Sequence, residues 1–328
     1  MRTAVILGAG YSSLAGLPLA ADLLDDHFYI TSLGAERRFD AVLAAWKDYR
    51  AAHPTAWPEL FLTELYKNAS VHGVQWQWAV ELVAATLASP RGMDVPVVRN
   101  IRYSGRLTKE VQSNALVQFW DIVCGADLRG VVTTNYDLLA ERGLRHRALK
   151  RRRRPGFHYG GFSKPQRLKG LAQPWTVLDQ QRIIVLDTGV PLYKLHGSLN
   201  WSHEGGELLM YQDMRPAFRR GADALIIPPM TEKETPEWLS VIWADASSFL
   251  SSCERWIVCG YSLPVYDIAL EVLFGRSASN AREICVIDPC AARLARRWQQ
   301  VAPNARVFNF DGLPRGLQAL HEHLRSDV

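Results

Sequence analysis

The sequence predicts an α/β protein with a doubly wound parallel sheet and a large helical insertion. The first observation is a regular alternation of strand and helix patterns from Leu225 to Leu324, which is typical of parallel sheets covered on both faces. The second is a glycine-rich turn, Gly8 to Ser12, directly after an apolar run. The third is a group of polar side chains, Thr133 to Asp137, that follows another apolar run. Both groups belong where strands turn into helices in Rossmann-like sheets.

Length and composition indicate a soluble globular protein. The chain has 328 residues, of which 48% are hydrophobic, and this is enough to bury a full core in a single domain spanning residues 1–328. The longest apolar runs are interrupted or far shorter than the roughly 20 residues that a membrane span requires. The N-terminus lacks the basic and apolar regions of a signal peptide. We therefore expect a cytoplasmic protein without membrane contact.

The cysteines favour neither a disulfide framework nor a zinc site. Their number is odd and no two of them form a C-x-x-C pair, which argues against both kinds of site. His321 and His323 lie two positions apart and so do not share a helical face. We therefore expect a reduced protein that binds no metal. The cysteines are Cys124, Cys253, Cys259, Cys285 and Cys290.

The net charge of +5 is unevenly distributed along the chain. The stretch from Arg145 to Arg154 reads R-H-R-A-L-K-R-R-R-R, and such a basic run can attract nucleic acid or an acidic partner. No aromatic side chains are interleaved with the charges. A solvated segment beside a helix end is therefore the stronger interpretation, and nucleic-acid contact is the weaker one.

The N-terminal segment predicts a strand, a tight turn and a helix. Thr3 to Leu7 is a short buried strand, after which Gly8 and Gly10 let the backbone turn and approach a phosphate closely. Pro18 suits the first turn of a helix that continues to Leu24. Ser13 replaces the third glycine of the dehydrogenase fingerprint G-x-G-x-x-G, and no strand with a terminal acid follows at the usual distance. Hydride transfer is therefore disfavoured.

Residues 35–125 are expected to form the helical insertion. Apolar residues recur at helical spacing in three stretches, and residues 108–124 form a plausible last helix. Tryptophans in this insertion could line a cofactor pocket, but core packing is the stronger expectation. The three stretches are Phe39, Val42, Leu43 and Trp46; Trp57, Phe61 and Leu65; and Trp76, Val80, Leu82, Val83 and Leu87.

The middle of the chain predicts a strand over residues 130–134 and a helix over 138–147. An irregular insertion follows at about 148–182, whose Pro155 to Pro174 stretch is rich in glycine, proline and aromatics and suits a lid or a surface excursion. Strands are then expected at 183–186 and 191–195, and they lead the chain to His196.

The rest of the chain completes the sheet in regular alternation. We expect strands at residues 225–227, 256–260, 283–287 and 306–310, and helices at 237–252, 267–274, 291–301 and 313–324.

Two strand ends carry candidate chemistry. Ligands of open α/β sheets bind outside the carboxyl ends of the strands, where Thr133, Thr134, Asn135 and Asp137 stand. The simpler alternative is that Asn135 and Asp137 only turn the chain and cap the next helix. His196 has a comparable alternative as a satisfied polar residue, although Gly197 clears space beside it and Ser198 and Asn200 add hydrogen-bonding groups.

Taken together, the motifs resemble those of a known family. The motifs G-A-G-Y-S at Gly8 to Ser12, T-T-N-Y-D at Thr133 to Asp137 and H-G at His196 follow one another in this order, with G-Y-S-L-P at Gly260 to Pro264 and an acid at Asp288 after them. The combination resembles the sirtuin-like NAD-consuming domain family, in its bacterial NAD glycohydrolase branch. The deacylase branch carries two C-x-x-C pairs, which this chain lacks, so the resemblance gives little support to an acyl-lysine cleft.

The resemblance implies specific roles. Asn135 would orient the ribose and the attacking water, and His196 would accept a proton, a role that suits a histidine with its ordinary pKa of roughly 6.5. The remaining residues would bind NAD, which is the substrate. They are Gly8, Ala9, Gly10 and Ser12 at the pyrophosphate, Gly260 and Ser262 as a second contact, Asp288 at the adenosine ribose, and Thr133, Thr134 and Asp137 beside Asn135.

The implied function is hydrolysis of NAD to nicotinamide and ADP-ribose, in antiviral defence by NAD depletion. An NAD-dependent protein deacylase, an ADP-ribosyltransferase and a non-catalytic module that senses NAD or ADP-ribose are the alternatives. Control of such an activity would require a homo-oligomer or a separate regulatory protein.

Overall fold

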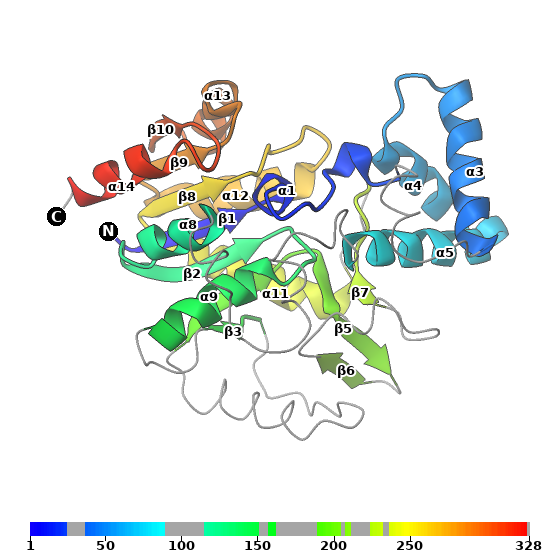
Figure 1. Ribbon diagram of the computed structural model, residues 1–328, viewed down its shortest axis with the longest axis horizontal. Coiled ribbons are helices and arrows are strands. Elements are labelled where there is room, and N and C mark those ends of the chain that lie inside the picture. The colour runs from blue at the N-terminus through cyan, green and yellow to red at the C-terminus, as the bar shows by residue number, and fades with distance from the viewer. Residues whose placement is uncertain are drawn as a thin grey trace.

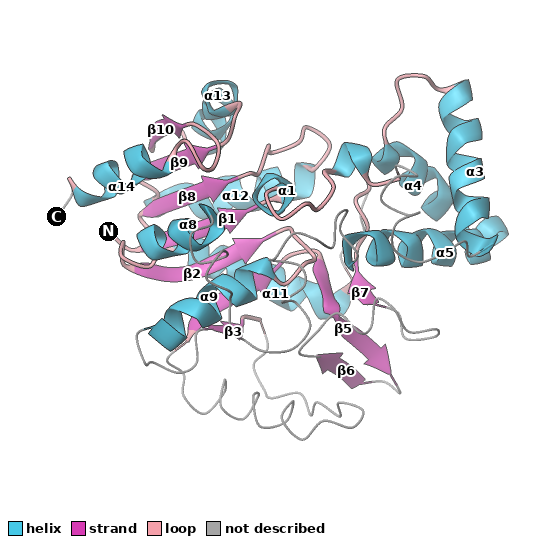
Figure 2. Cartoon of the chain, in the orientation of Figure 1, coloured by secondary structure: helices cyan, strands magenta, loops and turns pink. Residues whose placement is uncertain are grey.

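The fold is built on a seven-stranded parallel sheet with helices on both faces, as the sequence predicts (Figures 1 and 2). The computed structural model describes residues 1–24, 37–88, 115–150, 157–161, 189–204, 207–210, 224–231 and 236–326. The strand order is β10-β9-β8-β1-β2-β4-β3, and all six pairs are parallel. The strands are β1 (Thr3–Leu7), β2 (Leu128–Thr133), β3 (Phe157–Tyr159), β4 (Val190–Lys194), β8 (Arg255–Cys259), β9 (Glu283–Ile287) and β10 (Arg306–Phe310).

Five of these strands end in one line. In the hydrogen-bonded register, Leu7 is the partner of both Thr133 and Cys259, Cys259 is also the partner of Ile287, and Thr133 is the partner of Lys194. The loops that follow these residues therefore emerge side by side at one edge of the sheet. At about 4.8 Å between neighbouring strands, this edge spans roughly 19 Å from β9 to β4.

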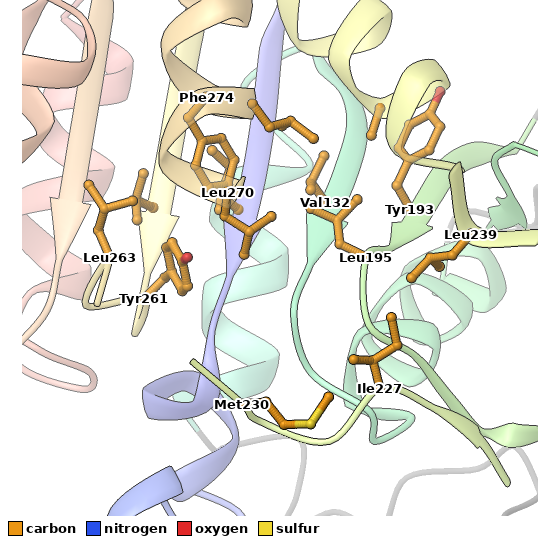
Figure 3. Close-up of a cluster of buried hydrophobic side chains, with 14 of the residues drawn as sticks. Val132, Tyr193, Leu195, Ile227, Met230, Leu239, Tyr261, Leu263, Leu270 and Phe274 are labelled. Atoms are coloured by element: carbon orange, nitrogen blue, oxygen red, sulfur yellow. The ribbon is translucent and has the colours of Figure 1, made fainter. Parts of the chain in front are cut away.

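Alternate residues of each strand face opposite layers of helices. Ala4 and Ile6 of β1 belong to a core shared with α11, α12 and α13, while Val5 and Leu7 belong to a core shared with α8, α9 and α14. This period of two is the geometry of a strand buried on both faces. Figure 3 shows part of the first core, where Val132 and Leu195 lie near the carboxyl edge of the sheet. The helices are α8 (Ala115–Val123), α9 (Leu139–Lys150), α11 (Glu237–Ser251), α12 (Ile268–Ser277), α13 (Ala291–Val301) and α14 (Leu317–Arg325).

The expected helical insertion is mostly helical where it is described. Helices α3 (Arg37–Ala52), α4 (Pro58–Lys67) and α5 (Ala69–Ala88) pack together at one end of the molecule (Figure 1). The rings of Trp46 and Phe61 lie 5.4 Å apart, and Trp46 is buried. Packing therefore explains this tryptophan, whereas Trp57 is 45% exposed. Residues 89–114 lie outside the described part of the chain.

A second, antiparallel sheet was not expected. It has the order β6-β5-β7, with β5 at Gly197–Glu204, β6 at Glu207–Met210 and β7 at Ala224–Ile226. The prediction that residues 225–227 form a strand of the parallel sheet is therefore wrong. A three-residue apolar run carries no information about which sheet it joins, and β7 pairs with β5.

Two further expectations need correction. The helix predicted from Pro18 to Leu24 is absent: α1 (Ala9–Ser13) begins inside the glycine-rich turn, and only a single 3-10 turn, Ala20–Asp22, follows. Gly16, at φ +80°, turns the chain between them. The stretch predicted to be irregular, 148–182, contains the end of α9 at 148–150, the edge strand β3 and a turn at 160–161. The rest of it lies outside the described residues, as does the strand expected at 183–186.

The C-terminal half follows the prediction most closely. Strands β9 and β10 and helix α13 coincide with their predicted ranges, and α14 begins at Leu317 rather than at residue 313. The first six residues of the basic run, 145–150, form the end of α9, and residues 151–156 lie outside the described part. No helix in the described part of the chain has the length and apolar content to cross a membrane.

Candidate active site

Two glycine-bearing loops meet at the carboxyl edge of the sheet. The N–H of Gly10, after β1, donates to the carbonyl of Gly260, after β8, at 2.9 Å. A Cβ atom on Gly8 would lie 2.6 Å from that same carbonyl oxygen. The N–H groups of Gly8, Gly10 and Tyr11 all bond to protein carbonyls. These glycines therefore permit the loops after β1 and β8 to come into backbone contact. The sequence pattern did not reveal this role.

We expect Gly260→Ala to destabilise this edge. Gly260 has φ +63°, and an added Cβ would lie 2.1 Å from the nitrogen of Tyr11. Strain at a positive φ costs of order 1–3 kcal/mol, and the clash adds to it. Urea unfolding should give a loss of about 2 kcal/mol or more. Gly73→Ala is the matched control, because nothing lies within 4 Å of its added Cβ. Equal stability of the two variants would contradict the close contact of the loops.

Asn135 is held by both hydrogens of its amide. Its Nδ2 atom donates to the carbonyl of Gly8 and to Oγ of Ser12, each at 2.8 Å. Because the Gly8 carbonyl can only accept, this contact fixes which end of the amide is nitrogen. The other end, Oδ1, accepts no hydrogen bond from the described residues. Asn135 thus presents a fixed acceptor at the carboxyl end of β2.

Asp137 completes this buried group. Its Oδ2 accepts a hydrogen bond from Oγ of Ser12 at 2.6 Å, and its Oδ1 accepts from the N–H of Leu139 at 2.8 Å. Burial raises the pKa of Asp137, and the charge of Lys194 and the two hydrogen bonds oppose that rise. Asp137 therefore both caps the start of α9 and orients Ser12, so the capping alternative is right for one of its oxygens.

Lys194 stabilises the loop that follows β2. It is fully buried, and its Nζ donates to the carbonyls of Tyr136 and Asp137 and pairs with Oε1 of Glu141 at 2.9 Å. The cation thus holds two consecutive peptide groups, those that follow Tyr136 and Asp137, while Glu141 of α9 balances its charge. Sequence reasoning missed this residue, although a lysine in the run P-L-Y-K-L at the end of β4 was a visible signal.

His196 lies on the turn between β4 and β5, beside the loop that carries Asn135. It is 5% exposed, and its ring lies 6.1 Å from that of Tyr136 at an interplanar angle of 30°. Its Nε2 lies 4.0 Å from Oδ2 of Asp267, an equally buried residue. Asp267 is a site residue that the sequence did not indicate, because it stands 71 positions from His196 and merely seemed to begin a helix.

The carboxylate of Glu59, in the helical insertion, lies in the same region as Tyr136 and Asp267. Glu59 of α4 is 2% exposed, and its Oε1 accepts a hydrogen bond from the hydroxyl of Tyr266 at 2.5 Å. Tyr136 donates its own hydroxyl to the carbonyl of Ile227 at 2.6 Å. Burial raises the pKa of Tyr136 well above its ordinary value, and the nearby charges of Asp267 and Glu59 raise it further. The hydroxyl of Tyr136 therefore stays protonated.

The remaining predicted residues are more scattered. Thr133 and Thr134 are buried, and the Thr133 hydroxyl donates to the carbonyl of Leu7 at 3.2 Å. Ser262 is exposed, and Asp288 accepts the N–H of Cys290 at 2.8 Å. Ser198 and Asn200, expected beside His196, bond to each other instead, and Asn200 donates to Tyr159 in the network around Glu141.

One group of possible metal ligands lies at the opposite end of the strands. Donor atoms of Glu283, Cys285 and His323 lie within 4.8 Å of one another. The same Glu283 oxygen accepts hydrogen bonds from Arg255 and His323. Burial raises the pKa of Glu283, but the bond and charge of Arg255 outweigh it and hold that pKa below its usual range. A cation already balances this carboxylate, so the group is explained as a buried ion-pair network.

Comparison with known proteins gives weak likenesses only. No family model matches the chain, and no curated protein matches it. A mutant Sir2 homologue in complex with 2'-O-acetyl ADP ribose is 15% identical, with 99% of this chain and 92% of that chain covered and a TM-score of 0.47. A Sir2 homologue in complex with NAD is 14% identical, with 99% and 90% covered and a TM-score of 0.47. These values are too low to support an inference about activity.

Proposed function

We propose that this protein is an NAD glycohydrolase that cleaves NAD to nicotinamide and ADP-ribose. The observation that carries the proposal is the pair formed by a fixed amide acceptor, Asn135, and a buried histidine, His196, on neighbouring loops at one sheet edge. The order of the sequence motifs, which resembles that of the sirtuin-like NAD-consuming family, supplies the substrate.

The reaction breaks the bond between nicotinamide and ribose. Its transition state is oxocarbenium-like, so the site must hold the ribose hydroxyls and deliver water to the carbon. In our proposal, Oδ1 of Asn135 accepts a hydrogen bond from a ribose hydroxyl or from the water. Because both hydrogens of this amide are already used, the acceptor does not reorient when the substrate arrives.

His196 is the proposed general base. Water adds its oxygen to the ribose carbon, the electron pair of the broken bond leaves with nicotinamide, and the proton of the water passes to His196 and then to solvent. Asn135 and His196 can act on one substrate because β2 and β4, whose ends lead into their loops, are adjacent strands in register.

The other proposed contacts lie along the same edge. The backbone N–H groups of Gly8 and Gly10 are already paired, so a pyrophosphate would depend more on Ala9, whose N–H at the first position of α1 has no partner within that helix, and on the exposed Ser262. Asp288 would face the adenosine ribose from the end of β9. Thr133, Thr134 and Asp137 act through the loop that holds Asn135.

The deciding experiment is incubation of the purified protein with NAD, with nicotinamide and ADP-ribose followed over time. Equal, steady release of both products is expected. Consumption of NAD only when an acetyl-lysine peptide or a protein acceptor is added would favour a deacylase or an ADP-ribosyltransferase. Saturable NAD binding without products would favour a sensing module.

We expect NAD to be cleaved in preference to NADP. Asp288 would stand close to the 2'-phosphate of NADP, and two like charges in a partly buried site repel by on the order of a few kcal/mol. Rates measured with each substrate should therefore differ by at least about tenfold, since 1.4 kcal/mol corresponds to that factor. Asp288→Asn should reduce the difference between the cleavage rates of NAD and NADP. Equal cleavage by the unaltered protein would remove Asp288 from the ribose site.

The bacterial branch of the family also suggests a role in antiviral defence by NAD depletion. The test is expression in a bacterial host, with intracellular NAD measured before and after phage challenge. Loss of NAD on challenge in cells with the unaltered protein, and not in cells with a His196→Ala variant, is the expected result. Constant depletion without challenge would exclude a restrained resting state held by assembly or by a partner.

A further inference from the structure

Asp267 stands at the start of a helix without capping it. It is the N-cap residue of α12, a position where aspartate normally accepts an N–H from the first turn. Its side chain makes no such bond. An acid that is 5% exposed and does not cap its own helix has a different use.

The other two acids at strand-to-helix loops behave in the usual way. Asp137 accepts the N–H of Leu139, and Asp288 accepts the N–H of Cys290, each at 2.8 Å. The carboxylate of Asp267 instead lies 4.0 Å from Nε2 of His196, across the interface between the β8–α12 loop and the β4–β5 turn.

The groups that surround His196 include carboxylates and tyrosine hydroxyls. The titratable groups that face this region are Asp267 and Tyr266 before α12, Tyr136 after β2, and Glu59 of α4. Lys194, two residues before His196, directs its ammonium group toward Tyr136, Asp137 and Glu141. The charge that lies 4.0 Å from the imidazole, on Asp267, is negative, and it favours the imidazolium that forms when His196 accepts a proton.

We infer that Asp267 is a positioning residue that orients His196 and stabilises its protonated form during NAD cleavage. The inference rests on the proposed function for its role in catalysis, but the pairing itself can be tested without NAD. Because Asp267 is proposed to act through His196, its loss should affect turnover more than substrate binding.

The kinetic test compares Asp267→Asn with the unaltered protein. Asparagine keeps the size of the side chain but removes the charge. We expect kcat to fall by at least about tenfold with KM changed by less than about threefold. The acid limb of the pH–rate profile should move down by about one pH unit, because the histidine loses a neighbour that favours its charged form. Asp267→Glu should recover part of the activity.

The matched control is Glu271→Gln on the same helix. Glu271 lies one turn after Asp267 and pairs with Arg297 at 3.0 Å, so the control removes one negative charge from α12 without removing the partner of His196. Its kinetics and pH profile should match those of the unaltered protein. An unchanged profile in Asp267→Asn, or an equal shift in Glu271→Gln, would overturn the inference.

A second measurement separates this inference from the proposed function. The imidazole resonance of His196 can be identified among the 9 histidines by its loss in His196→Gln, and titrated by NMR in the absence of NAD. A titration midpoint lower by about one unit in Asp267→Asn supports the pairing even if no NAD is cleaved, in which case the glycohydrolase proposal alone fails. A midpoint that is equal in both proteins, or no titration in either, overturns the pairing.

Discussion

His196→Ala is expected to lower the rate of NAD cleavage by about 10²–10⁴-fold, the range that a general base contributes. The histidine is buried at the edge of the core, and its neighbours Tyr136 and Ile227 keep their mutual hydrogen bond without it. The variant should therefore fold, with a thermal midpoint close to that of the unaltered protein. Turnover is measured by nicotinamide release at saturating NAD, and NAD affinity by calorimetry.

His53→Ala is the control for this experiment. His53 is an exposed histidine after α3, where its Nδ1 lies 3.0 Å from the carbonyl of Tyr49 and its ring lies 4.4 Å from that of Tyr49. Turnover in this variant should be unchanged. A folded His196→Ala protein that cleaves NAD at nearly the normal rate would remove His196 from the mechanism.

Asn135→Ala is a less clean test than the sequence suggests. The side chain is 9% exposed, and its removal takes away two hydrogen bonds, one to the carbonyl of Gly8 and one to the hydroxyl of Ser12. The carbonyl keeps the N–H of Tyr11, and the hydroxyl still donates to Asp137. We expect this variant to lose activity, but its stability must be measured by unfolding as well, since each lost hydrogen bond costs about 0.5–1.5 kcal/mol.

Lys194→Met is expected to destabilise the protein by about 3–5 kcal/mol, because it leaves a buried carboxylate without its counter-charge. Glu141 is 4% exposed, and its other described partner at Oε1 is the hydroxyl of Tyr159. The carbonyls of Tyr136 and Asp137 lose the ammonium group as a donor as well, although that of Tyr136 keeps the N–H of Leu199. Activity should fall together with stability, because these carbonyls belong to the loop that carries Asn135.

Urea unfolding measures this loss. The double variant Lys194→Met with Glu141→Gln should regain a large part of the stability, because the unpaired charge is then gone. Lys47→Met, at an exposed lysine of α3, should stay within about 0.5 kcal/mol of the unaltered protein. If Lys194→Met were no worse than Lys47→Met, the buried pair would have no part in holding the loop.

Local patterns predicted those parts of the fold that depend on local physics. Strands β9 and β10 and helix α13 coincide with their predicted ranges. Short buried strands and an amphipathic helix each give a recognisable pattern of apolar residues in the sequence. The strand β7 was assigned to the wrong sheet, because pairing with β5 is a long-range choice. The helix expected at Pro18 failed because the turn at Gly16 separates two short helical segments.

In the candidate site, too, local motifs could be predicted from the sequence and long-range contacts could not. Gly260 and Asn135 stand in recognisable motifs, so their positions could be predicted, but the reason for Gly260 is its contact with Gly10. Asp267 and Lys194 could not be assigned roles from the sequence, because their partners, His196 and Glu141, are 71 and 53 positions away. Such contacts are fixed only when the sheet brings the loops together.

The hydrogen bond between Glu59 and Tyr266 joins residues 207 positions apart, one in the helical insertion and the other next to Asp267. A change in the position of α4 should therefore be coupled to a change in the position of the Asp267 carboxylate beside His196. Thermodynamic linkage then applies: a molecule that binds the insertion more tightly in one arrangement of α4 would change the affinity of the site for NAD. By reciprocity, NAD would change the affinity for that molecule by the same factor.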